Sequence, residues 1–100
     1  HADAVPVLPG AADLVESGFI PGGTERNRND LAHAVRFAES VTPSLRTLLF
    51  DAQTSGGLLI CVAKDSADAL LEELRRNGCG VAAVIGEMRS GTAGEIEVQS

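Results

Sequence analysis

The hydrophobic and polar positions divide the chain into short apolar runs separated by polar, glycine-rich stretches. The longest apolar run covers residues 57–63 and contains Leu58-Leu59-Ile60-Cys61-Val62 without a polar interruption, which is typical of a strand buried on both faces. Residues 81–85 are also continuously apolar and predict a second strand. Residues 95–98 alternate between charged and apolar side chains after a glycine-rich turn at 90–94, so they predict a partly exposed strand.

Helical spacing is clearest between the two apolar runs. Within residues 67–76 one face collects the apolar side chains, and polar residues mark both ends: Asp65-Ser66 as the N-cap and Asn77-Gly78 as the stop. Shorter helices are predicted for residues 11–17, which precede Gly18, and for residues 43–49, which begin with a proline. The residues expected on the apolar face are Ala67, Leu70, Leu71 and Leu74.

One more helix is predicted where apolar residues keep i, i+3, i+4, i+7 spacing, and the preceding residues 19–29 are predicted to be a loop because they are rich in Gly, Asn and Arg. The helical positions are Leu31, Ala34, Val35 and Ala38. The order of helices and strands indicates a layered α/β (α+β) domain with a mixed sheet and packed helices. We expect residues 1–100 to form one domain with no internal boundary.

The composition of the chain limits the kinds of molecule that it is expected to bind. Hydrophobic residues make up 44% and charged residues 22%, which indicates a folded domain. A formal net charge of −6 argues against a nucleic-acid partner, because that binding needs a dense basic surface. The chain has no run of about 18 apolar residues and no basic-then-apolar leader, so we expect no membrane partner and a cytoplasmic location.

The two cysteines and two histidines do not have the spacing of a metal site, so no metal is expected on this chain. Cys61 lies in the apolar run and is predicted to be a small core residue, whereas Cys79, between two glycines, is predicted to be exposed. His33 is expected at the surface.

Two loops carry the candidate chemistry. Residues 51–57 pass from an aspartate through two hydroxyl side chains to a glycine pair, and residues 21–27 combine glycines, a threonine and an arginine. Glycine lets the backbone approach a ligand closely, and hydroxyl and backbone N–H groups donate to phosphate oxygens. The nucleotide- or phosphate-facing candidates are Gly22, Gly23, Thr24, Arg26, Asn27, Gln53, Thr54, Ser55, Gly56 and Gly57.

Several roles remain open within these loops. Arg26 would neutralise charge on a transferred phosphoryl group or would be a solvated surface residue. Asn27 would orient Arg26, bind a phosphate oxygen or form part of a turn. For Asp51 we favour a structural role, in an Asx-turn that fixes the loop, over a metal ligand. No base lies near Ser55 in sequence, so no catalytic nucleophile is expected in this chain.

The chain resembles the C-terminal domain of selenophosphate synthetase (selenide, water dikinase). The order and approximate spacing of the motifs agree along nearly the whole chain. The matching motifs are Leu8-Pro9-Gly10-Ala11, Gly18-Phe19-Ile20-Pro21-Gly22-Gly23-Thr24 with Arg26-Asn27, Asp51-Ala52-Gln53-Thr54-Ser55-Gly56-Gly57-Leu58-Leu59-Ile60, and Ala82-Ala83-Val84-Ile85-Gly86-Glu87.

This resemblance implies a parent enzyme that converts ATP, selenide and water into selenophosphate, AMP and phosphate. It implies the C-terminal fold of the phosphoribosylformylglycinamidine cyclo-ligase superfamily, in which the C-terminal domain packs against an N-terminal ATP-binding domain and helps to close the active site. ATP and Mg²⁺ are then bound mainly by that N-terminal domain, which also forms a homodimer. Neither cofactor is expected to bind to the 100 residues alone.

The sequence lacks the family's catalytic Cys or selenocysteine, its neighbouring Lys, its Mg²⁺-binding aspartates and a "DVTGFGLLGH"-like helix. We therefore expect an incomplete C-terminal domain that is inactive alone and exposes apolar surface and a sheet edge. Two alternatives stay open: a sister enzyme of the cyclo-ligase or thiamine-monophosphate kinase type, and a non-catalytic module that binds an anion or a partner. The Gln53-Thr54-Ser55 triplet favours selenium chemistry over the sister enzymes.

Overall fold

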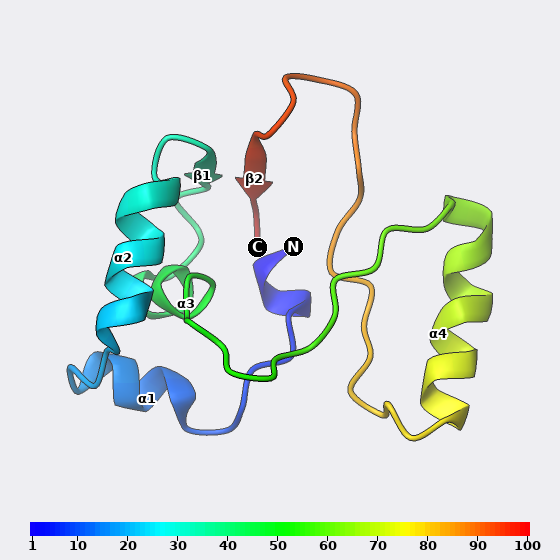
Figure 1. Ribbon diagram of the computed structural model, residues 1–100, viewed down its shortest axis with the longest axis horizontal. Coiled ribbons are helices and arrows are strands. Elements are labelled where there is room, and N and C mark those ends of the chain that lie inside the picture. Colours follow the sequence, from blue (N-terminus) through cyan, green and yellow to red (C-terminus); the bar gives the residue numbers. More distant parts are fainter.

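The computed structural model describes residues 1–100 as a small mixed domain of helices and strands. Figure 1 shows α1, α2, α3 and both strands grouped together, with α4 set apart and joined to them by extended segments on either side. The fold class predicted from the sequence is confirmed. The elements are η1 (Ala2–Ala4), α1 (Ala11–Glu16), α2 (Gly22–Leu31), β1 (Val35–Phe37), α3 (Pro43–Leu48), η2 (Lys64–Ser66), α4 (Ala67–Arg76) and β2 (Ile96–Val98).

The sheet consists of β1 and β2, which pair in parallel with Val35 opposite Ile96 and Phe37 opposite Val98. Beside this pair the backbone N–H of Ala2 donates to the carbonyl of Gln99 at 2.6 Å. The two ends of the chain therefore lie next to each other at the sheet (Figure 1). The strand predicted for residues 95–98 is confirmed.

A small core holds α3 against β1. Val41 and Phe50 are buried, and the ring of Phe37 meets the ring of Phe50 edge-on, with centroids 5.7 Å apart. Arg46 lies over the ring of Phe37, 5.5 Å from its centroid, and its guanidinium donates to the carbonyls of Val41 and Ala38 at 2.8 Å. Because Phe50 directly precedes the loop at 51–57, this core fixes where that loop begins.

Local signals at helix ends explain α1 and α3, both of which are confirmed. Gly18 adopts a φ of +85°, a left-handed conformation that favours glycine and ends α1. Thr42 caps α3 by accepting a hydrogen bond from the N–H of Leu45 at 3.3 Å, and Pro43 occupies the first turn, where its missing N–H costs nothing. Ser44 also donates to Glu16 at 2.8 Å, which joins α3 to α1.

Replacing Thr42 with alanine should lower the free energy of unfolding by about 1 kcal/mol, because the N–H of Leu45 loses its capping acceptor. Thr42→Ser should retain most of the stability. Thr92→Ala is the matched control, since Thr92 is exposed and caps no helix. Urea denaturation followed by circular dichroism measures all three, and equal midpoints for Thr42→Ala and Thr92→Ala would contradict the capping role.

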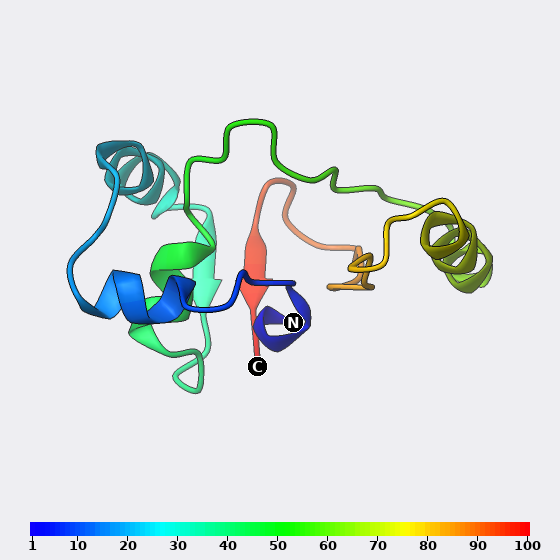
Figure 2. The ribbon, with the colours of Figure 1, turned by 90° about the horizontal axis from the view of Figure 1, so that it is seen from below.

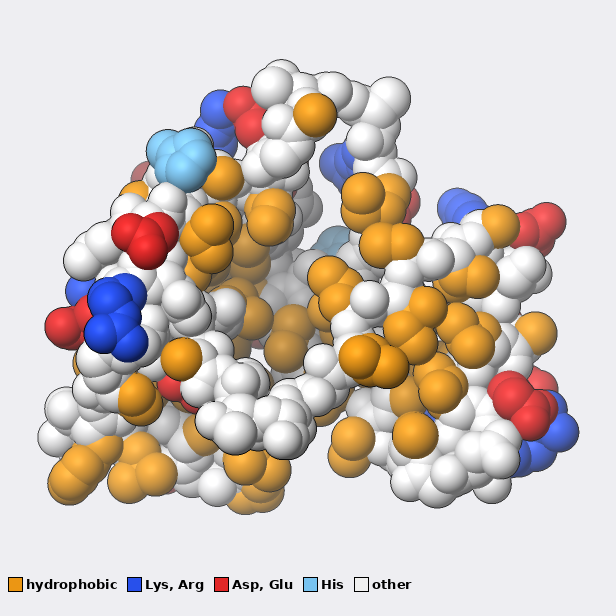
Figure 3. Space-filling view, in the orientation of Figure 1, with side chains coloured by type: hydrophobic (Ala, Val, Ile, Leu, Met, Phe, Trp, Pro, Cys, Tyr) orange, Lys and Arg blue, Asp and Glu red, His pale blue; other side chains and the backbone are white.

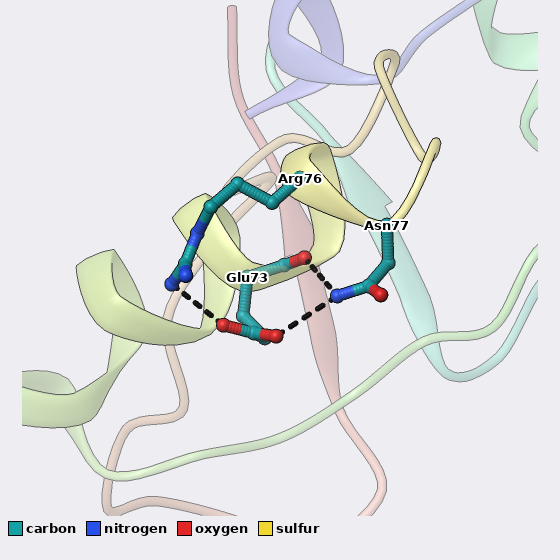
Figure 4. A network of polar contacts seen from close by, with 3 residues as sticks. All are labelled: Glu73, Arg76 and Asn77. Carbon is teal, nitrogen blue, oxygen red and sulfur yellow. Dashed lines mark hydrogen bonds and ion pairs between the residues drawn. The ribbon is translucent and has the colours of Figure 1, made fainter.

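The prediction of α4 is confirmed, including its end at Asn77-Gly78, where Gly78 has a φ of +92°. The predicted side-chain cap by Asp65-Ser66 is wrong: the chain enters α4 through η2, and Ser66 makes no capping hydrogen bond. Figure 4 shows the polar network at the other end of α4, where Glu73 pairs with Arg76 at 2.6 Å and accepts from the side-chain amide of Asn77 at 2.9 Å.

Two predictions for residues 19–38 are wrong. The predicted loop at residues 19–29 is wrong, because Gly22–Leu31 form α2, and the predicted helix around Leu31 to Ala38 is wrong, because β1 lies at Val35–Phe37. The helix α2 has almost no apolar residues, so hydrophobic periodicity does not reveal it. Side-chain contacts with the residues after α3 secure it instead, as described below. Pairing with the distant β2 decides the conformation of β1.

The two apolar runs also depart from prediction. Residues 57–63 and 81–85 belong to no strand, and Leu58 and Val81 are 89% and 77% exposed. Cys61 is exposed rather than buried, whereas the predictions that Cys79 and His33 are exposed are confirmed. A strand forms only when a neighbouring backbone supplies hydrogen bonds, and no such neighbour lies beside either run in this chain.

The molecule is consequently open. Its accessible surface is 7731 Å², whereas a folded protein of this mass exposes about 5,400 Å². The radius of gyration is 14.6 Å, compared with about 13 Å for a typical domain of this length. Figure 2 shows α4 at one end, reached by the extended segments, and Figure 3 shows a hollow between the two parts with apolar side chains on its walls. None of the helices is long and apolar enough to span a membrane.

Candidate functional site

The two loops that carry the candidate chemistry meet at the N-terminal end of α2. The hydroxyl of Thr24 donates to Oδ1 of Asp51 at 2.6 Å, and the side-chain amide of Asn27 donates to the carbonyl of Phe50 at 3.0 Å. Thr24 is buried, and Asn27 lies one turn along α2 on the same side. These bonds join segments that are more than 20 residues apart in the sequence, so the fold brings both predicted loops into one place.

We call this meeting point the junction; it consists of Gly23, Thr24 and Asn27 on α2 and residues 50–53. Within it, Gly23 lies against Ala52. A Cβ placed on Gly23 would lie 2.8 Å from the Cβ of Ala52, closer than folded proteins tolerate, whereas a Cβ on Gly22 would meet nothing within 4 Å. Gly23 is therefore required here for contact between two parts of the chain. The sequence pattern predicted that glycine would admit a ligand, and the structure shows that its neighbour is Ala52.

Asp51 is the centre of the junction. Its second carboxylate oxygen, Oδ2, accepts a hydrogen bond from the side-chain amide of Gln53 at 2.7 Å. The carboxylate thus accepts from two side chains rather than from a backbone N–H in the predicted Asx-turn. These contacts agree with a structural role for Asp51. They also engage the polar groups of Thr24, Asn27 and Gln53, three of the residues predicted to face a ligand.

The segment from Thr54 to Gly57 lies outside these contacts. From Thr54 to Gly57 neither side chains nor backbone groups make any hydrogen bond within the chain, and all four residues are exposed. Ser55 has a φ of +55°, in the left-handed region, and a Cβ on Gly56 would lie 2.7 Å from that of Gln53. The loop is therefore sharply turned, and its hydroxyl and N–H donors face solvent.

Arg26 is exposed and curls back toward the start of α2. Its Nη2 atom lies 4.0 Å from the position that a Cβ on Gly23 would occupy. The first N–H groups of a helix have no partner within the helix, and the helix dipole adds partial positive charge there. The structure thus places a cation at the positive end of α2, whose first turn also contacts the loop that carries Thr54 and Ser55.

A shallow, mostly apolar pocket of about 160 Å³ adjoins the junction, between α1, α2 and α3. Its polar lining consists of Thr24, Thr47 and Asp51. Apolar side chains come from α1, α3 and residues 19–20. The sequence analysis did not identify this pocket, nor the roles of Phe50 and Ala52 at the junction. The available signal was the small residue directly after Asp51, which allows close contact with a glycine.

The chain does not fit a resident metal ion. No group of three His, Cys, Asp or Glu side chains lies close enough together to hold one, and Asp51 already accepts two hydrogen bonds. The one distinctly shifted acid lies outside both loops: a hydrogen bond from Arg89, together with its charge, lowers the pKa of the exposed Glu87 carboxyl. The site described here is therefore one of hydrogen-bond donors and a single cation.

Comparison with known proteins gives the family. Residues 15–99 match the family described as AIR synthase related protein, C-terminal domain. The chain belongs to this family. The match covers every residue of the junction and of both loops. It confirms the prediction that the fold is that of the C-terminal domain of the cyclo-ligase superfamily.

Three similar curated proteins share the name selenide, water dikinase. The chain is 45% identical over 84 residues to the selenide, water dikinase of Pelobacter propionicus, which covers 84% of this chain and 24% of that protein. It is 42% identical over 88 residues to that of Aliarcobacter butzleri (88% of this chain, 25% of that protein) and 42% over 98 residues to that of Paraburkholderia xenovorans (98% and 27%). The resemblance recognised in the sequence is confirmed, and the chain spans about a quarter of the length of these relatives.

Proposed function

We propose that this chain is the C-terminal domain of an ATP-dependent selenophosphate synthetase that converts ATP, selenide and water into selenophosphate, AMP and phosphate. The observation that carries the proposal is the junction itself. Both loops that resemble the synthetase motifs lie side by side, joined by the 2.6 Å hydrogen bond from Thr24 to Asp51. The shared name of the relatives, at 42–45% identity, supports the same assignment.

The proposed contribution of this domain is electrostatic. Phosphoryl transfer depends mainly on positioning and on stabilising the charge of the transferred group. The guanidinium of Arg26 would bind phosphate oxygens, and the hydroxyls of Thr54 and Ser55, with the nearby N–H groups, would donate to them. Since Thr24, Asn27 and Gln53 already bond within the chain, they would hold the loops in place rather than touch the nucleotide.

Other parts of the proposed enzyme would supply what this chain lacks. Because no group of side chains fits a metal ion, Mg²⁺ and most contacts to ATP belong in this proposal to a separate ATP-binding domain, which would also form the homodimer. The open surface supports such a partner: Leu58, Val81 and Met88 are each more than 75% exposed. The two free cysteines, both exposed, are in keeping with the reducing cytoplasm.

The test replaces the free donors in the complete polypeptide that carries this chain. Arg26→Ala combined with Thr54→Ala should lower selenide-dependent formation of AMP by roughly tenfold to a hundredfold, because donors aimed at developing charge are removed. Phosphorus NMR of selenophosphate and chromatography of AMP measure the product. Arg28→Ala with Thr92→Ala is the matched control, because both of these residues are exposed and lie outside the two loops.

Three outcomes would redirect the proposal. Unchanged selenophosphate output in the double variant would show that these loops do not serve catalysis. ATP turnover that does not depend on selenide would favour a sister enzyme of the cyclo-ligase or thiamine-monophosphate kinase type. The family match is compatible with such an enzyme. Micromolar nucleotide binding by the 100 residues alone, without turnover in the complete polypeptide, would favour a non-catalytic anion-binding module.

A further inference from the structure

The loop at 54–57 is attached to the rest of the molecule only at its base. No residue from Thr54 to Val62 makes a hydrogen bond to any other part of the chain. At the base of this loop, the backbone N–H groups of Phe50 and Asp51 donate to α3, and three side-chain hydrogen bonds join Phe50, Asp51 and Gln53 to each other or to α2. The position of the free donors relative to Arg26 is consequently set by the junction at residues 50–53.

Asp51 makes two of the three side-chain hydrogen bonds at the base of the loop. It is the residue that bonds both to α2 and to the loop. One oxygen accepts from Thr24 on α2 and the other accepts from Gln53 on the loop. Thr24 is only 2% exposed, and Asp51 is half-buried, so the bond between them is shielded from water. A hydrogen bond from a hydroxyl to a carboxylate is among the stronger kinds, and its loss would leave the hydroxyl of Thr24 buried without a partner.

We infer that Asp51 is a positioning residue, whose carboxylate holds the donor-rich loop 54–57 at the N-terminal end of α2 by binding Thr24 and Gln53 at once. Asp51 itself touches no phosphate: its negative charge would repel one. It acts by keeping Thr54 and Ser55 in a fixed place relative to Arg26. We call the two hydrogen bonds from Thr24 and Gln53 to Asp51 the tether. The inference of a tether rests on these contacts alone. Only the identity of the ligand that the loop meets rests on the proposed function.

The tether is tested by hydrogen–deuterium exchange in the complete polypeptide. Asp51→Ala and Thr24→Val should each speed exchange of the hydrogen-bonded backbone amides at the two ends of the tether, residues 24–25 and 50–51, by about tenfold to a hundredfold. If both act through one bond, the double variant should exchange no more than about threefold faster than Asp51→Ala. Asp30→Ala is the matched control, since Asp30 is exposed on α2 and has no hydrogen bond or ion pair.

Kinetics of the same variants separate positioning from loss of fold. Asp51→Ala should lower kcat for AMP formation by about tenfold with little change in the KM for ATP, because the loop acts in the transition state. Thr24→Ser keeps the hydroxyl and should restore kcat to within about threefold of the wild type, whereas Thr24→Val should not.

The experiments distinguish failure of the proposed function from failure of the tether. If the complete polypeptide has no selenide-dependent turnover, the proposed function fails, and the exchange measurement still decides the tether. If Asp51→Ala exchanges like Asp30→Ala, or if the effects of Thr24→Val and Asp51→Ala simply multiply in the double variant, the tether is overturned.

Discussion

Replacing Phe50 with alanine is expected to lower the free energy of unfolding by about 3–5 kcal/mol, an amount comparable to the total stability of a small domain. Phe50 is 8% exposed and packs edge-on against Phe37, and the guanidinium of Arg46 lies over the ring of Phe37. Removing the ring takes away buried apolar surface and leaves a cavity that the small core cannot refill. Urea denaturation followed by circular dichroism should therefore show a large shift of the midpoint, or a chain already unfolded in buffer.

Phe19 provides the matched control for this experiment. It is the same residue type, but its side chain is 71% exposed, so Phe19→Ala should change the stability by no more than about 0.5 kcal/mol. Comparable losses for Phe50→Ala and Phe19→Ala would mean that the core described here does not hold the domain together. Phe50→Leu is a useful third variant, because it keeps an apolar side chain in the core and should fold even where Phe50→Ala does not.

The same substitution connects the core to the candidate site. The carbonyl of Phe50 accepts from Asn27, and the next residue is Asp51, which binds Thr24. Any shift of the backbone at Phe50 is passed directly to both hydrogen bonds of the junction. The aromatic core and the site therefore form one structural unit, which explains why a polar helix such as α2 is stable where it lies.

The helices α1, α3 and α4 could be predicted from residues within or next to each helix. Thr42-Pro43 and Gly18 mark the ends of α3 and α1, and the apolar face of α4 repeats at helical spacing. These features depend on residues within a few positions of each other, so the sequence displays them directly. The prediction of α4 was correct even though the helix lies apart from the core (Figure 1).

Predictions failed where distant contacts decide the conformation. The helix α2 has polar residues on all sides, and its bonds to Phe50 and Asp51 cannot be read from residues 22–31. The apolar run at 57–63 indicates where burial would be favourable but does not supply the neighbouring strand that burial requires. The β1 segment is a strand because residues near the end of the chain pair with it.

The candidate site was predictable as two loops but not as a junction. Glycines, hydroxyls and an arginine identified both loops from residue types alone. Which of those groups are already bonded within the chain depends on how the loops meet, and only the structure shows that Thr24 and Gln53 bind Asp51 while Thr54 and Ser55 are free. The roles of these residues toward a nucleotide stay predictions.

Gly23→Ala is expected to have the second-largest effect on stability, because it forces the two loops apart. The added Cβ would lie 2.8 Å from the Cβ of Ala52, an atom fixed to the backbone that cannot rotate away. Overpacking of this kind costs about 1–3 kcal/mol, set against the small gain in helix propensity from alanine. Denaturation should show the loss of stability, and faster hydrogen exchange at the hydrogen-bonded amides of Phe50 and Asp51 should show the displaced loop.

Two further variants isolate this contact. Gly22→Ala adds the same methyl group one residue earlier in α2, where nothing lies within 4 Å, so it should leave stability unchanged or slightly raised. Ala52→Gly removes the atom that the new Cβ would strike, so combining it with Gly23→Ala should recover most of the lost stability. Recovery requires that the two residues act on one another, whereas simple addition of the single effects would show that Gly23 is needed for a reason other than Ala52.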